Sequence, residues 1–271
     1  MSRIKDQIPL ALYLLAAAAA LFSPYVFDST GRTATIALYA CGVLLFFAVS
    51  FYFSRQNRVM FTSVLFFALL FVSYPLIKYQ QETIDLQFPG VMFAVPVLVY
   101  FSLVVLIKKL RSSVSWLRIG SFDIITVLLI AVMTVLTGAG LLGWVFLLKP
   151  DLDTFKVMLP SWKLPLLVLG GFGFALTNSL VEEFMYRGVL WDGLSGHIGK
   201  PLPVILVQAG LFGIWHFRGF PGGAVGIIMV FVWGIFLGLV RERSKGMIAP
   251  IVSHICADLT IFFMLLLVLK G

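Results

Sequence analysis

Three short motifs place ionisable side chains inside long apolar stretches of this chain. An ionisable side chain at the centre of a bilayer costs at least about 2.5 kcal/mol, so such a group usually has a chemical function or a close partner. Two carboxylates, an arginine, two histidines and an aspartate together predict a polar site inside a helical bundle. The motifs read Glu182-Glu183-Phe-Met-Tyr-Arg187, Phe212-Gly-Ile-Trp-His216 and His254-Ile-Cys-Ala-Asp258.

In the first motif, helical spacing separates the two glutamates. Residues four apart share a face of an α-helix, so Glu183 and Arg187 can form an ion pair. Glu182 lies about 100° around the helix and has no cation nearby in the sequence. A desolvated carboxylate of this kind is suited to act as a general acid or base near neutral pH. The alternative is that all three residues form one buried ion-pair network that fixes helix packing.

Two of the histidines lie in apolar stretches, and each has a partner at helical spacing. Phe212 and His216 are one turn apart, whereas Asp258 shares a face with His254 and could orient its imidazole or help it bind an oxyanion or a metal. Each pair could equally be a packing contact between helices. At 1.5 Å per residue, Glu182 and His216 lie about 20 and 23 Å deep when counted from the same side of the membrane, so we expect them to meet. His254 lies at a smaller depth than these two residues, so its helix must begin deeper in the membrane or tilt to reach them.

The composition is that of an integral membrane protein. Of the 271 residues, 61% are hydrophobic and 12% are charged, whereas a soluble domain has about 25% charged residues. Long continuous apolar runs favour helices, which satisfy every backbone polar group without water, over a β-barrel of short alternating strands. We therefore predict an all-α fold, a polytopic transmembrane helical bundle of about eight or nine helices.

Nine apolar runs are candidates for these helices. A spanning helix needs about 20 residues, so the seventh and eighth runs are short, and the fifth and sixth are long. The first run lacks a clear cleavage site and is interpreted as a retained helix rather than a signal peptide. Trp191 and Asp192 are expected at the membrane interface, where Trp is common. The runs lie near 8–27, 34–53, 59–77, 91–107, 119–148, 165–195, 201–217, 225–240 and 247–269.

The net charge of +8 comes from Lys and Arg residues that lie mainly in short connecting segments. This pattern indicates membrane topology and contact with anionic lipid, so we expect no nucleic-acid partner. The segments that would be cytoplasmic with an inside N-terminus carry most of these residues, which places the N-terminus in the cytoplasm. In a bacterium the membrane would be the cell membrane. Two cysteines are too few for a disulfide framework.

Taken in order, the motifs resemble a known family. This order is similar to that of the CAAX prenyl protease 2 and bacteriocin-processing family of intramembrane endopeptidases (CPBP, Rce1-like or ABI). Its pattern in a polytopic membrane protein is EExxxR, then FxxxH, then HxxxN or HxxxD. The resemblance covers roughly residues 165–265, and Gly188 and the stretch before His254 agree with it. Residues 1–118 carry no signal of the family. We expect them to form a scaffold of transmembrane helices, and residues 119–271 to form the catalytic core.

The resemblance implies a role for each matching residue. Glu182 matches the catalytic glutamate and His216 its partner, which together would activate a water for attack on the scissile carbonyl. His254 and Asp258 match the pair that stabilises the oxyanion. Asp258 departs from the asparagine that is common in prenyl proteases. An ionised aspartate cannot donate a hydrogen bond to an oxyanion, so Asp258 would have to be protonated or act by orienting His254. The supporting residues are Glu183, Arg187 and Phe212.

The resemblance also implies an endopeptidase that needs no cofactor. Glu182, His216 and His254 could instead hold zinc as in a metalloendopeptidase, but the HExxH pattern is absent from the sequence. The expected substrate is a membrane-associated protein or peptide, lipidated or not, cut in CAAX-type, C-terminal sorting-signal or bacteriocin-type processing. Two alternatives stay open: a non-proteolytic membrane immunity or regulatory binding protein, and a proton-coupled transporter, although inverted repeats typical of transporters are not seen.

Overall fold

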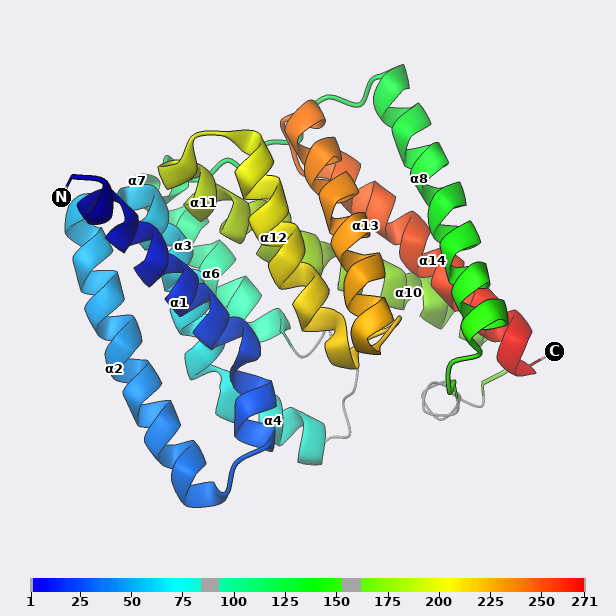
Figure 1. Ribbon diagram of the computed structural model, residues 1–271, viewed down its shortest axis with the longest axis horizontal. Coiled ribbons are helices and arrows are strands. Elements are labelled where there is room, and N and C mark those ends of the chain that lie inside the picture. Colours follow the sequence, from blue (N-terminus) through cyan, green and yellow to red (C-terminus); the bar gives the residue numbers. More distant parts are fainter. Residues whose placement is uncertain (1, 84–92, 153–161, 271) are drawn as a thin grey trace.

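The bundle is entirely helical in the part of the chain that the structure describes. The computed structural model describes residues 2–83, 93–152 and 162–270, and every regular element in these ranges is a helix. The prediction of an all-α helical bundle is therefore confirmed. In Figure 1, α1 and α2 lie at one side of the bundle, α12 and α13 in the middle, and α8 at the opposite side.

Helix α3 is the central helix of the N-terminal half. It contacts α1, α2 and α6, and apolar side chains are buried around it, as expected for a helix surrounded by others. Asn57 begins this helix by accepting hydrogen bonds from Val59 N and Met60 N, and its Nδ2 donates to Gly196 O near the end of α11. The helices of this half are α1 Ser2–Asp28, α2 Arg32–Gln56, α3 Arg58–Val72, α4 Tyr74–Thr83, α6 Ala94–Leu106 and α7 Lys108–Arg111.

The helices of the C-terminal half carry the three motifs. Asp123 begins α8 by accepting from Thr126 N at 2.8 Å, and Gly199, with a φ of +67°, ends α11 in the left-handed conformation that favours glycine. A π-helix follows Glu183 directly. The elements are α8 Ile124–Gly143, η1 Trp144–Leu148, α10 Leu164–Glu183, η2 Phe184–Leu190, α11 Trp191–Ile198, α12 Pro201–Trp215, η3 His216–Arg218, α13 Gly223–Ser244 and α14 Ile248–Lys270.

Six helical segments of the described residues are long and apolar enough to cross a membrane, and a seventh is added if α3 and α4, which bend by 45°, form one span. The chain is therefore a multi-pass integral membrane protein. Each of the nine predicted runs contains a helix, although residues 91 and 92 of the fourth run lie outside the described residues. The expected number of eight or nine transmembrane helices included α6 and α12. These two helices have 13 and 15 residues, which is fewer than a helix needs to span a membrane.

The helices that carry the motifs, and α13 beside them, approach one another closely at glycines. A Cβ atom at Gly171 of α10 would lie 2.6 Å from the Phe262 ring of α14. Similarly, a Cβ atom at Gly234 of α13 would lie 3.0 Å from Cα of Ala209 on α12. Small residues let backbones come together in membranes, where apolar side chains gain little from leaving lipid. These contacts bring the polar side chains of four helical segments within reach of one another.

Trp191 and Asp192, which are expected at the membrane interface, are both buried among the helices. The Asp192 carboxylate accepts hydrogen bonds from the Ser115 backbone N–H, at 2.5 Å, and from the Ser115 hydroxyl. Arg241 of α13 donates to the same hydroxyl at 2.7 Å. This network attaches the connection between α7 and α8 to α11 and α13, so it links the two halves of the chain.

Replacing Asp192 with alanine is expected to lower the unfolding midpoint of the detergent-solubilised protein. The change removes the acceptor of the partly buried Ser115 N–H, and an unpaired donor costs up to about 1–3 kcal/mol when it is fully buried. Asp28→Ala is the matched control, because Asp28 pairs with Lys78 at 2.9 Å but both side chains are more than a third exposed. The measurement is thermal unfolding followed by tryptophan fluorescence. Equal midpoints for the two variants would contradict a structural role for Asp192.

Candidate functional site

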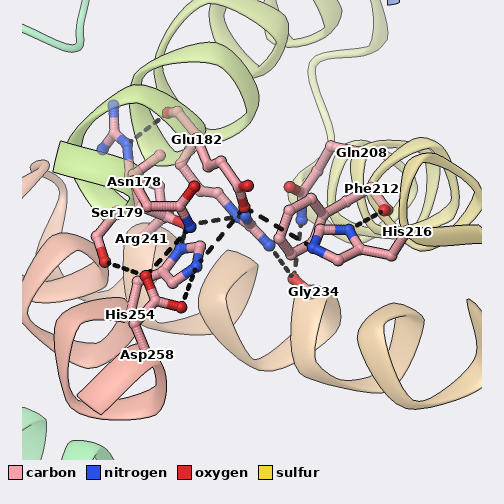
Figure 2. A network of polar contacts seen from close by, with 12 residues as sticks. Asn178, Ser179, Glu182, Gln208, Phe212, His216, Gly234, Arg241, His254 and Asp258 are labelled. Carbon is pink, nitrogen blue, oxygen red and sulfur yellow. Dashed lines mark hydrogen bonds and ion pairs between the residues drawn. The ribbon is translucent and has the colours of Figure 1, made fainter. Parts of the chain in front are cut away.

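The three motifs meet at one place in the bundle. Figure 2 shows Glu182, His216 and His254 brought together from three helical segments. Glu182 Oε2 lies 4.0 Å from Nε2 of His216 and 3.6 Å from Nε2 of His254. The expected meeting of Glu182 and His216 is confirmed. The smaller depth of His254 is compensated by the tilt of α14, which runs obliquely past α13 in Figure 1.

Glu182 is the carboxylate without a cation, as its helical position predicts. It lies near the end of α10, is 8% exposed, and its Oε2 has no hydrogen-bond partner among the described residues. The two histidine nitrogens at 3.6 and 4.0 Å are too far away for direct hydrogen bonds. At these separations, one small molecule can bond to both a ring nitrogen and the carboxylate. The arrangement is therefore suited to hold a water.

The His216 ring has a defined hydrogen-bonding direction. Its Nδ1 is 3.0 Å from the carbonyl oxygen of Phe212, and because a carbonyl only accepts, Nδ1 carries a hydrogen. In the neutral ring, Nε2 is then an acceptor that faces Glu182. The Phe212 ring packs edge-on against the imidazole at a centroid distance of 4.6 Å. Tyr25 of α1 donates to Trp215 O at 2.5 Å, so the N-terminal half also holds this end of α12.

His254 is oriented by Glu183. Its Nδ1 lies 2.7 Å from Oε1 of Glu183, whereas its Nε2 is 3.6 Å from Oδ1 of Asp258, which is longer than a hydrogen bond. The orienting contact expected from Asp258 is therefore made by Glu183 instead. Both ring nitrogens face carboxylate oxygens, since Nε2 is also 3.6 Å from Glu182 Oε2. An imidazolium at this position would direct both of its N–H groups to negative charge.

Arg187 pairs with Glu183, as the spacing of four predicts. Its Nη1 donates to Glu183 Oε1 at 2.9 Å, and both side chains are fully buried. Its Nη2 donates to Gly234 O of α13 at 3.2 Å. The guanidinium also lies over the Phe212 ring, 4.5 Å from the ring centre. Arg187 therefore fixes the carboxylate that orients His254, and it contacts the ring that packs against His216.

The structure adds three polar residues that the sequence analysis did not single out. Asn178 Nδ2 and Ser179 Oγ donate to Oδ2 of Asp258 at 3.2 and 3.1 Å, and Gln208 Nε2 donates to Gly234 O at 3.0 Å. Each lies four positions before a motif residue, namely Glu182, Glu183 and Phe212. Because residues four apart share a face of a helix, this spacing could have identified them. Each lies in an apolar run, where a polar side chain needs a partner.

The zinc alternative, with Glu182, His216 and His254 as ligands, stays a prediction. In the part of the chain that the structure describes, no three His, Cys, Asp or Glu side chains are grouped as ligands of one metal ion. His254 directs Nδ1 to Glu183 and His216 directs Nδ1 to Phe212 O, so the Nε2 atom of each ring is left facing Glu182. The same side chains are arranged for proton transfer, because an unpartnered carboxylate oxygen faces an acceptor nitrogen and a second imidazole.

The chain matches one family model. Residues 163–260 match the family described as Type II CAAX prenyl endopeptidase Rce1-like. This segment contains all three motifs, so the resemblance inferred from them is confirmed. No curated protein and no solved structure matches the chain. The matched family is described as one of prenyl endopeptidases.

Proposed function

We propose that the chain is an intramembrane endopeptidase of the glutamic type, because residues 163–260 match the Rce1-like family model. It hydrolyses a peptide bond in a membrane-associated protein or peptide, in CAAX-type, C-terminal sorting-signal or bacteriocin-type processing. One observation carries the proposal. The buried Glu182 Oε2 has no hydrogen-bond partner among the described residues and lies between Nε2 of His216 and Nε2 of His254.

Water activation follows from this arrangement. A water donates one hydrogen to Glu182 and the other to His216 Nε2, which leaves an oxygen lone pair directed at the substrate. As the water oxygen bonds to the carbonyl carbon, Glu182 takes a proton and the electrons of the C=O double bond move to the carbonyl oxygen. When the tetrahedral intermediate collapses, the C–N bond breaks and the amine leaves with the proton from Glu182.

His254 is the donor nearest to these events. With Nδ1–H donating to Glu183 at 2.7 Å, the imidazolium form of His254 also carries an Nε2–H, and this is the group that can approach a developing oxyanion. A fixed donor of this kind lowers the barrier because it requires no reorganisation when charge develops. Glu183 and Arg187 act through His254 and Phe212, and they are positioning residues in this proposal.

The distribution of basic residues supports a cytoplasmic N-terminus. Helix α7, which contains Lys108, Lys109 and Arg111, lies at the same end of the bundle as the N-terminus (Figure 1). The connections that carry Lys200 and Lys245 lie at this end too. Because cytoplasmic segments carry an excess of Lys and Arg, we place this end in the cytoplasm. Residues 1–118 then act as a scaffold for a catalytic core of residues 119–271.

The proposal is tested by comparing protein and peptide termini in native membranes that contain the wild-type chain or Glu182→Gln. Mass spectrometry should find new termini with the wild type alone, and these termini identify the substrates. Both proteins must be present in equal amounts and folded. Identical sets of termini would overturn the proposal and favour a membrane immunity or regulatory protein that binds its partner without cutting it.

Metal removal gives an independent check of the mechanism. Cleavage by the purified protein is expected to stay within about twofold of its starting rate after treatment with 1,10-phenanthroline, because in this mechanism side chains alone activate the water. The matched control is the non-chelating isomer 1,7-phenanthroline at the same concentration. A large loss with the chelator alone, reversed by added zinc, would contradict the glutamic mechanism and assign Glu182, His216 and His254 as ligands.

A further inference from the structure

A buried amide lies between two carboxylates of the site. Asn178 is 7% exposed and precedes Glu182 by one helical turn. Its Nδ2 is 3.2 Å from Oδ2 of Asp258, and its side chain also interacts with the Glu182 carboxylate. Figure 2 shows Asn178 and Ser179 beside Asp258 and His254. This amide has no part in the mechanism described so far.

The chemistry of its neighbours determines how the amide points. An ionised carboxylate only accepts hydrogen bonds, so the NH₂ group of Asn178, and not its oxygen, faces Asp258 and Glu182. The Asp258 oxygen also accepts from Ser179 Oγ at 3.1 Å. Asp258 Oδ2 is therefore the acceptor for two donors, while the amide beside it carries two N–H groups.

We propose that Asn178 donates a hydrogen bond to the carbonyl oxygen of the scissile peptide bond as that oxygen becomes negative. The inference rests on the proposed endopeptidase function. The attacking water bonds to Glu182, and reacting atoms approach to about 3–3.5 Å, so the carbonyl oxygen comes close to the groups around Glu182. Asn178 is such a group, and it is neutral, so it does not need to lose or gain a proton.

The transfer of a proton to Glu182 frees the Asn178 amide at the moment when the oxyanion forms. When Glu182 takes a proton from the water, its carboxylate loses its negative charge and attracts the Asn178 N–H less strongly. At the same moment, the electrons of the C=O double bond move to the carbonyl oxygen, which becomes the stronger acceptor. Asn178 keeps both of its hydrogens throughout. Asp258 is the positioning residue that keeps the amide turned towards the site.

Ser179 provides the matched control for the test. Asn178→Ala and Ser179→Ala each remove one donor from the same Asp258 oxygen, at 3.2 and 3.1 Å, but only the first removes the proposed oxyanion donor. Removing one such donor typically costs about 10²–10³-fold in kcat. We expect that loss for Asn178→Ala, with KM within about threefold of wild type, and a loss at least tenfold smaller for Ser179→Ala.

The comparison uses single-turnover cleavage of a substrate peptide by the full chain in lipid nanodiscs, together with the unfolding midpoint of each variant. Asn178→Leu, which keeps the shape of the side chain without its donor, replaces Asn178→Ala if the latter does not fold. Equal kcat losses at positions 178 and 179 would overturn the inference and leave Asn178 as a support for Asp258. Cleavage by Glu182→Gln within tenfold of the wild-type rate would instead overturn the proposed glutamic mechanism, so the two failures are distinguishable.

Discussion

Replacing Glu182 with glutamine is expected to lower the rate of peptide-bond hydrolysis by about 10²–10⁴-fold, which is what a positioned general base or acid contributes. Glutamine has the size of glutamate but cannot take a proton from water. Because Glu182 Oε2 has no hydrogen-bond partner among the described residues, the exchange removes no protein hydrogen bond at that atom. The protein should therefore stay folded and still bind its substrate.

The measurement is single-turnover cleavage of a substrate found through its termini, with unfolding midpoints recorded for each variant. Glu242→Gln is the matched control, since Glu242 is a glutamate on α13 that pairs with Lys245 at the protein surface. It should cleave at the wild-type rate. A Glu182→Gln protein that cleaves within tenfold of wild type would remove Glu182 from the mechanism.

Replacing Arg187 with alanine is expected to destabilise the protein by about 3–5 kcal/mol, the usual cost of removing one partner of a buried ion pair. The Glu183 carboxylate, which is fully buried, would keep its charge without its cation. Gly234 O would lose one of its two donors, and the Phe212 ring would lose the guanidinium above it. Activity should fall as well, because Glu183 orients His254.

Arg243→Ala is the control for this prediction. Arg243 pairs with Asp123 at 2.9 Å, the same distance as the Arg187–Glu183 pair, but its side chain is 38% exposed and that of Asp123 is 50% exposed. Exposed pairs contribute little to stability, so the midpoint should move only slightly. Thermal unfolding in detergent, followed for both variants and the wild type, gives the comparison. Similar shifts for the two variants would contradict a structural role for Arg187.

The amino-acid sequence determined the features of this protein that depend on composition and on helix pitch. Long apolar runs with few charges produce a helical membrane bundle, because only helices satisfy the backbone without water in such segments. The pitch of the helix brings Glu183 to Arg187 and Phe212 to His216, since residues four apart share a face wherever the helix lies. The same rule turned Glu182 away from Arg187 and left it without a cation.

Only the tertiary structure decided which groups meet across helices. Helical spacing favoured Asp258 as the residue that orients His254, but the tilt of α14 against α10 brings Glu183 to within 2.7 Å instead. The same packing directs Asn178 and Ser179 to Asp258, and it buries Asp192 against Ser115, a residue 77 positions away. Distances between helices depend on how side chains interlock and on where glycines let backbones approach. The periodicity of a single sequence does not contain that information.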